Sequence, residues 1–135
     1  MESQFLIYVV EDNEWYNRLL VHSLSLNPDY NVVGFHSAKE VLRELDKGPA
    51  IITVDYGLPD MNGGELLEKI KEMDTSIEVI IISEQEKIET AVSLLRSGAY
   101  DYLVKSKDIK ELVLNTVNHI CRNFDVKKAL ATLKK

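Results

Sequence analysis

The chain has 135 residues, 45% of them hydrophobic, and a formal net charge of −6 from 16 basic and 22 acidic side chains. This length supports one full hydrophobic core, and the composition is that of an ordinary globular protein. The negative charge argues against direct binding to nucleic acid or membrane, because both need a positive protein surface. A single cysteine, Cys121, and the lack of a long apolar run near the N-terminus predict a cytoplasmic protein.

Five short apolar segments rich in β-branched residues predict strands, at residues 5–10, 31–35, 50–54, 78–82 and 100–104. A segment with helical periodicity follows each of them, and clusters of turn-forming residues separate the two kinds of segment. Because every parallel strand connection needs a crossover helix, this strict alternation predicts an α/β fold. We expect a parallel sheet with helices on both faces.

Apolar residues at helical spacing indicate which side of each predicted helix faces the core. Ser37 followed by Glu40 predicts a capping box at the start of the second helix, and Ser97-Gly98 predicts the end of the fourth. The expected core-facing residues, helix by helix, are Tyr16, Leu19, Leu20 and Leu24; Ala38, Val41, Leu42 and Leu45; Leu66, Leu67, Ile70 and Met73; Ile88, Ala91, Val92 and Leu95; and Ile109, Leu112, Val113, Val117 and Ile120.

Ionisable or hydroxyl residues close four of the five predicted strands: Glu11 and Asp12, Asp55, Ser83, and Lys105. Because parallel strands end at the same edge of a sheet, we expect these side chains to lie close together. Three carboxylates at one edge repel each other and favour a bound cation, and ligands that are all oxygen favour Mg²⁺. A carboxylate can also accept a phosphoryl group, whose oxygens a lysine and a hydroxyl would stabilise.

In this pattern the sequence resembles the CheY-like receiver-domain family of bacterial response regulators, which act in two-component signalling. The matching segments are residues 9–13 and 54–64, Ser83, and residues 98–105, and the resemblance covers roughly residues 4–122. It implies a flavodoxin-like, doubly wound sheet with strand order 2-1-3-4-5 and five helices. It extends to the NtrC type of transcriptional activator, in which the receiver is the N-terminal domain.

The resemblance implies a metal-dependent phosphoacceptor site. Asp55 would accept a phosphoryl group from a sensor histidine kinase. Asp12 and Asp55 would bind Mg²⁺ directly, Glu11 would hold a coordinated water, and the backbone carbonyl of Gly57 would complete the ligands. The chain would then be a signalling domain that catalyses its own phosphorylation and dephosphorylation, with transcription regulation as the expected output.

The resemblance also assigns residues to the phosphoryl oxygens and to the conformational switch. Ser83 and Lys105 would bind the phosphoryl oxygens, and Tyr102 would be the aromatic switch residue that follows Ser83 inward. Trp15, three residues after Asp12, is expected to pack near the acidic cleft.

The chain departs from the family pattern at two positions. Glu11 stands in place of the commoner aspartate, and its longer side chain should still reach the metal through a water. Ser106 replaces the proline that usually follows the lysine. A non-proline cis peptide bond costs about 2.5–4 kcal/mol, so we expect a trans Lys105–Ser106 bond.

Three other interpretations are weaker. A flavodoxin-like cofactor module needs a phosphate-binding loop after the first strand, where Glu11 and Asp12 would repel phosphate. A haloacid dehalogenase-type hydrolase would have a second carboxylate at the position of Gly57. A degenerate receiver that is never phosphorylated would lack some of the reactive groups, all of which are present here.

The C-terminal segment continues beyond the length that a receiver needs. We expect residues 1–122 to form the receiver and residues 123–135 to form a helical extension, or the start of a linker to an effector domain. Alanine, leucine and lysine favour a helix there, and Val126, Leu130 and Leu133 form an apolar stripe. The hypothesis is that the last helices and their tails pair in a homodimer on phosphorylation; the alternative is a frayed end, because so short an unsupported helix is marginally stable in water.

Overall fold

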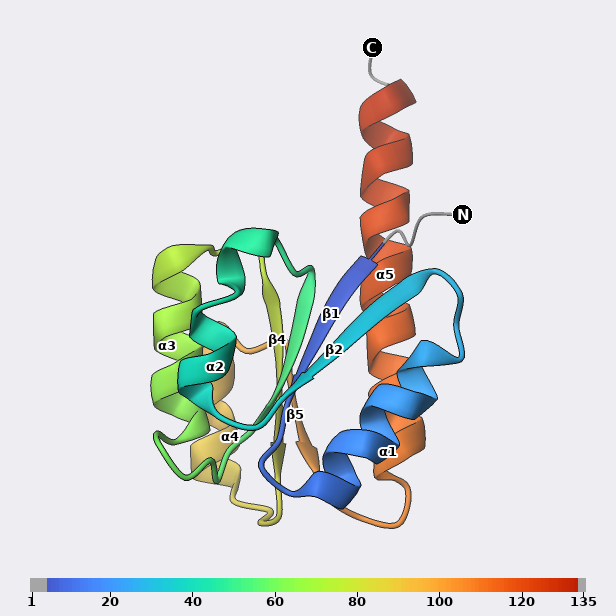
Figure 1. Cartoon of the computed structure of the whole chain (residues 1–135). Coiled ribbons are helices and arrows are strands. Elements are labelled where there is room, and N and C mark those ends of the chain that lie inside the picture. Colours follow the sequence, from blue (N-terminus) through green and yellow to red (C-terminus); the bar gives the residue numbers. More distant parts are fainter. Residues whose placement is uncertain (1–4, 134–135) are drawn as a thin grey trace.

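A five-stranded parallel sheet forms the centre of the computed structural model, which describes residues 5–133 (Figure 1). Its spatial order is β2-β1-β3-β4-β5, which confirms the predicted topology. The apolar runs of the three inner strands are largely buried on both faces of the sheet, whereas the two edge strands are partly exposed. The strands are β1 (Phe5–Val10), β2 (Tyr30–Phe35), β3 (Ile51–Asp55), β4 (Glu78–Ser83) and β5 (Asp101–Val104).

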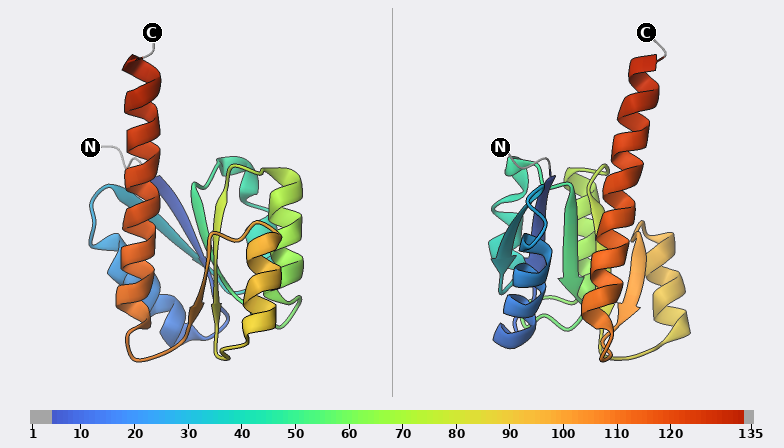
Figure 2. Two further views of the ribbon diagram at one scale, coloured as in Figure 1. Left: turned by 180° about the vertical axis from the view of Figure 1, so that it is seen from behind. Right: turned by 90° about the vertical axis from the view of Figure 1, so that its right-hand side faces the viewer.

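Helices cover both faces of the sheet, so the chain has two apolar cores, one on each side. Helices α1 and α5 lie on one face, and α2, α3 and α4 lie on the other (Figures 1 and 2). Among residues 5–133, no helix combines the length and the apolar character needed to cross a membrane. The helices are α1 (Glu14–Ser25), α2 (Ala38–Leu42), the 3₁₀ helix η1 (Leu45–Lys47), α3 (Gly63–Met73), α4 (Ile88–Arg96) and α5 (Ile109–Leu133).

Polar caps fix where three of the helices begin. The side chains of Asn13, Ser37 and Asn62 each accept a hydrogen bond from the backbone N–H three residues further on. The predicted end of α4 is also correct, because Gly98 adopts a φ of 111° that favours glycine. Since α1 starts directly after Asn13, the acidic loop that follows β1 is short and held at both ends.

The predicted core-facing sides of α1 and α2 are correct, whereas those of the later helices are partly wrong. In α3 and α5, Met73 and Leu112 are exposed. In α4 the predicted side is largely solvent-facing: Ile88 is 78% exposed, Val92 and Leu95 are also exposed, and Leu94 is buried instead. The reason is position, because α4 packs beside β5, the edge strand, which covers only a narrow strip of the helix.

The turn between β3 and α3 brings Gly63 against the backbone of Tyr56. The Gly63 N–H donates to the Tyr56 carbonyl at 2.8 Å, and a Cβ on Gly63 would lie 2.8 Å from the Tyr56 Cα. We therefore expect Gly63→Ala to lower the free energy of unfolding by about 1–3 kcal/mol, the usual cost of overpacking. Urea denaturation measures this loss. Gly57→Ala is the control, because a Cβ there meets nothing within 4 Å, and equal losses would contradict the prediction.

Candidate functional site

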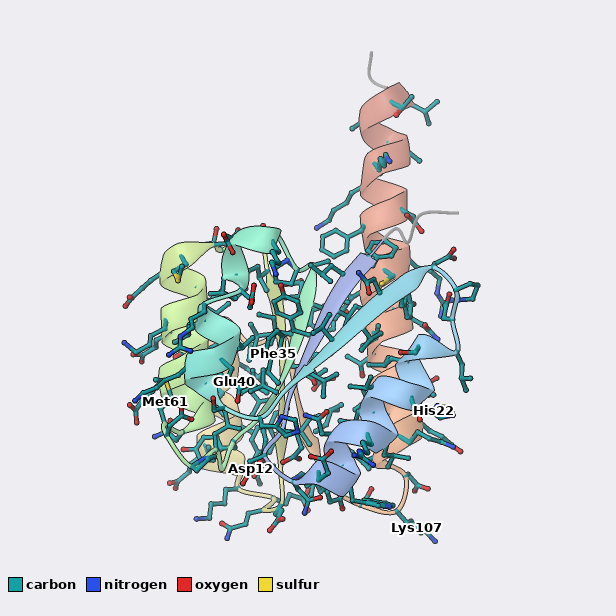
Figure 3. All side chains as sticks on the ribbon, in the orientation of Figure 1. Asp12, His22, Phe35, Glu40, Met61 and Lys107 are labelled. Atoms are coloured by element: carbon teal, nitrogen blue, oxygen red, sulfur yellow. The ribbon has the colours of Figure 1, made fainter. Side chains whose placement is uncertain are left out.

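An open cleft of about 740 Å³ lies at the carboxyl end of the sheet, where Asp12 is labelled in Figure 3. The parallel topology explains this position, since β1, β3, β4 and β5 all deliver their last residues to the same edge. The residues that line the cleft are Glu11, Asp12, Asn13, Asp55, Tyr56, Gly57, Ser83, Glu84, Gln85, Lys87, Thr90, Tyr102 and Lys105. All seven residues predicted for the site are among them.

Three carboxylates meet in this cleft. One oxygen from each of Glu11, Asp12 and Asp55 lies within 4.8 Å of the others. Glu11 and Asp55 are buried at the ends of β1 and β3, whereas Asp12 is exposed to solvent. A backbone N–H from Asn13 donates to Glu11 Oε2 at 3.1 Å and orients that side chain. A group of oxygen ligands at this spacing, partly open to water, fits a hard divalent cation.

Lys105 places a positive charge inside the carboxylate cluster. Its Nζ lies 2.7 Å from Glu11 Oε1 and 3.6 Å from Asp55 Oδ1, and its side chain is only 6% exposed. Burial disfavours the ammonium, but the two carboxylates hold the pKa of Lys105 above its usual value. The lysine is therefore a permanent cation at neutral pH. The peptide bond to Ser106 is trans, as predicted.

Glu11 is the most perturbed carboxylate of the cluster. Burial is the largest cause and raises the pKa of Glu11 to about 7, and the nearby Asp55 carboxylate adds to the effect. The hydrogen bond from Lys105 works in the opposite direction. With this raised pKa, Glu11 holds a proton part of the time near neutral pH when no metal ion is bound.

Ser83 and Tyr102 contact the same residue of the loop after β4. The Ser83 Oγ accepts a hydrogen bond from the backbone N–H of Gln85 at 3.2 Å. The Tyr102 hydroxyl donates to the backbone carbonyl of Gln85 at 2.6 Å. Gln85 therefore connects the serine at the end of β4 to the tyrosine of β5. At the end of β3, the Gly57 N–H donates to Asp55 Oδ1 at 3.4 Å.

Asn17 supports the site from α1 and was not singled out by the sequence. Its buried side-chain amide donates to the carbonyls of Glu11, at 3.0 Å, and Phe35, at 2.9 Å. It thereby ties the ends of β1 and β2 together and holds Glu11 in place. One feature of the sequence could have identified Asn17: it is a polar residue on the apolar, core-facing side of the predicted helix, next to Tyr16.

Asp60 is a second supporting residue that the sequence analysis did not identify. Its two carboxylate oxygens accept hydrogen bonds from the backbone N–H groups of Ala38, at 3.0 Å, and Lys39, at 2.9 Å. Desolvation would raise its pKa, but these hydrogen bonds hold the pKa of Asp60 below its usual value. The loop that carries Gly57 is thus fastened to the start of α2.

Trp15 lies outside the cleft, contrary to the prediction from its position in the sequence. It is 66% exposed and is not among the lining residues. Its ring meets the Tyr16 ring edge-on, with 5.0 Å between the centroids. The helical turn that starts at Asn13 directs residue 15 outward and residue 16 toward the body of the domain.

Comparison with known proteins identifies similar sequences. The family described as response regulator receiver domain matches residues 7–116. The chain is 33% identical over 109 residues to the DNA-binding transcriptional regulator NtrC of Escherichia coli strain K12, covering 80% of this chain and 23% of that protein. It is 35% identical over 114 residues to the transcriptional regulatory protein KdpE of Staphylococcus aureus, covering 83% and 47%. The chain thus spans less than half the length of these relatives.

Solved structures share the fold. A beryllofluoride-activated DrrB receiver domain superimposes with a TM-score of 0.80 at 24% identity, covering 90% of this chain and 99% of that one. The signal receiver domain of a LuxO repressor protein from Vibrio parahaemolyticus gives a TM-score of 0.82 at 24% identity, covering 94% and 97%. At this level of identity, the agreement concerns the architecture of the sheet and helices.

Proposed function

This chain belongs to the receiver-domain family of response regulators, and from this premise we propose that Asp55 accepts a phosphoryl group from a sensor histidine kinase. The observation that supports this most is the setting of Asp55. Its carboxylate is buried at the end of β3, lines the cleft, and lies close to Lys105 and to the carboxylates of Glu11 and Asp12. Labelling with acetyl phosphate and Mg²⁺, followed by mapping of the modified peptide, tests the proposal directly.

The acidic cluster fits Mg²⁺ as the metal of this site. We propose that Asp12 and Asp55 would bind it directly, that Glu11 would do so through water, and that the Gly57 carbonyl would be the backbone ligand. When bound, the metal supplies positive charge to the phosphoryl oxygens. The exposed Asp12 is the entry point, since the other two carboxylates are buried.

The residues of the chain have separate tasks in the proposed transfer. An Asp55 oxygen forms the new P–O bond while the bond from phosphorus to the donor breaks, and that electron pair leaves with the donor. Lys105 neutralises the developing negative charge, and the Ser83 hydroxyl donates to another phosphoryl oxygen. Lys105 would exchange part of its contact with Glu11 for the phosphoryl group.

The contacts of Gln85 support a switch that involves Ser83 and Tyr102. If Ser83 turns to a phosphoryl oxygen, its oxygen no longer accepts from the Gln85 N–H, and the loop after β4 is free to move. That movement breaks or carries along the Tyr102 bond to the Gln85 carbonyl. We propose that this rearrangement passes the phosphorylation state to the surface formed by α4 and β5.

We propose transcription as the output, because the relatives named above are transcription regulators. Residues 1–122 would form the receiver, and residues 123–135 would form a helical extension or the start of a linker to an effector domain; residues 1–4 and 134–135 of these two ranges lie outside the described part of the chain. The extension supports a homodimer as well, since its apolar side chains are exposed. α5 runs without a break from Ile109 to Leu133, so no hinge separates the two parts.

Mg²⁺ binding should weaken as the pH falls through 7. Burial raises the pKa of the Glu11 carboxyl group to about 7. Below that pH the carboxyl group holds a proton, which must leave when the metal ion binds. Apparent affinity is therefore expected to be nearly constant above about pH 8 and to fall about tenfold per pH unit well below the pKa. Calorimetric titration between pH 5.5 and 8.5 measures this. Glu11→Gln is the control, and an equally steep profile in that variant would assign the proton to another group.

A further inference from the structure

The aromatic ring of Tyr16 covers the ammonium group of Lys105. The Lys105 Nζ lies 4.4 Å from the ring centroid, within the distance of a cation–π contact. Tyr16 belongs to the first turn of α1 and is half-buried against the core on the α1 and α5 side of the sheet. The ammonium therefore has Glu11, Asp55 and an aromatic face as neighbours, which accounts for its small exposure.

The three neighbours of Lys105 differ in what happens to them during the proposed reaction. Both carboxylates are candidates for metal binding, and Asp55 is consumed as the acceptor. The ring is neither a metal ligand nor a reactant in the proposed transfer, so its contact with the ammonium does not depend on either event. It also excludes water from one side of the cation, which strengthens the remaining electrostatic contacts.

From this geometry we infer that Tyr16 is a positioning residue for phosphoryl transfer: its ring holds the Lys105 ammonium in the cleft while the carboxylates change partners. The inference rests on the proposed role of Lys105 at Asp55. If Tyr16 had only a structural role, any apolar side chain of similar size would fill it equally well, because such a side chain would also pack against the core on the α1 and α5 side of the sheet.

The first test compares Tyr16→Phe with Tyr16→Leu. Phenylalanine keeps the ring and removes the hydroxyl, whereas leucine keeps apolar packing without a ring. The initial rate of phosphorylation by phosphoramidate at saturating Mg²⁺ should fall about fivefold to thirtyfold in Tyr16→Leu and stay within about twofold in Tyr16→Phe. The affinity for Mg²⁺ alone should be the same in all three proteins. A leucine variant as fast as wild type would overturn the inference, and so would a phenylalanine variant as slow as leucine.

The second test is a spectroscopic signature that does not depend on turnover. The ε-methylene protons of Lys105 should show an upfield ring-current shift in wild type and Tyr16→Phe, and lose it in Tyr16→Leu. The signal is assigned by its disappearance in Lys105→Ala. An unshifted signal in wild type would overturn the inference even if Tyr16→Leu did not fold. Failure of the proposed function is distinguishable, because wild type would then show the shift and take up no phosphoryl group.

Discussion

Asp55→Asn should reduce Mg²⁺-dependent labelling by acetyl phosphate to the background level. Asparagine has nearly the same shape but an amide in place of the nucleophilic carboxylate, so the acceptor is lost while the packing at the end of β3 is kept. The variant should also fold, because it removes one of three mutually repelling carboxylates from the cluster. Incorporated label, measured on the intact protein, reports the first effect, and thermal unfolding reports the second.

Asp60→Asn is the matched control for this experiment. It makes the same chemical change five residues later, on a side chain that caps α2 and is not among the residues lining the cleft. It should cost up to about 2 kcal/mol of stability through the weaker cap and leave labelling in place. Stable label in Asp55→Asn would remove Asp55 from its proposed role, whatever the result for Asp60→Asn.

The fold was largely predictable because its signals are local. Each strand is a continuous apolar run, and the alternation of strands with helices requires a parallel sheet. The strand order is a different case, since it came from the resemblance and not from periodicity. The prediction of which face of α4 is buried was wrong, because Ile88, Val92 and Leu95 are exposed. Their spacing shows that the helix is amphipathic, but it does not show whether another element covers the apolar side.

The candidate site was predictable for one geometric reason. Residues that end parallel strands share an edge, so Glu11, Asp55 and Lys105 could be placed together without knowing a single contact. The residues that support this site could not be predicted in the same way. Asn17 and Asp60 act by hydrogen bonding to backbone groups of distant segments, and the sequence does not show which side chain reaches which carbonyl or N–H.

Glu11 and Lys105, which the sequence places in one cluster with separate tasks, contact each other in the structure. Sequence reasoning gave Glu11 to the metal and Lys105 to the phosphoryl group, as two separate tasks. In the folded chain these two side chains are 2.7 Å apart and stabilise each other. If Glu11 takes part in metal binding as proposed, the cation would compete with Lys105 for this carboxylate, and Lys105 would be less tightly paired when a phosphoryl group arrives.

The C-terminal part of α5 extends beyond the body of the domain, at the end opposite to Asp12 (Figures 2 and 3). Phe124 still packs, with its ring centroid 6.1 Å from that of Phe5. Beyond it, Val126, Leu130 and Leu133 are 56%, 51% and 81% exposed. An isolated helix of this length is only marginally stable in water. This segment continues a helix that is already packed against the domain, so no new helix nucleus has to form. An apolar stripe on such a helix is well placed to pair with a second copy.

Leu130→Glu should therefore weaken self-association of the full chain by at least about tenfold, because it places a charge in the proposed apolar contact. Thr132→Glu adds the same charge to the opposite side of the helix and should leave association unchanged. Sedimentation of both variants and wild type, with and without beryllofluoride and Mg²⁺, measures the effect and shows whether the phosphorylated state is required. If wild type stays monomeric at high concentration in both conditions, the stripe does not pair two copies. If both variants lose association equally, added charge is the cause, and the contact does not lie on the side of Leu130.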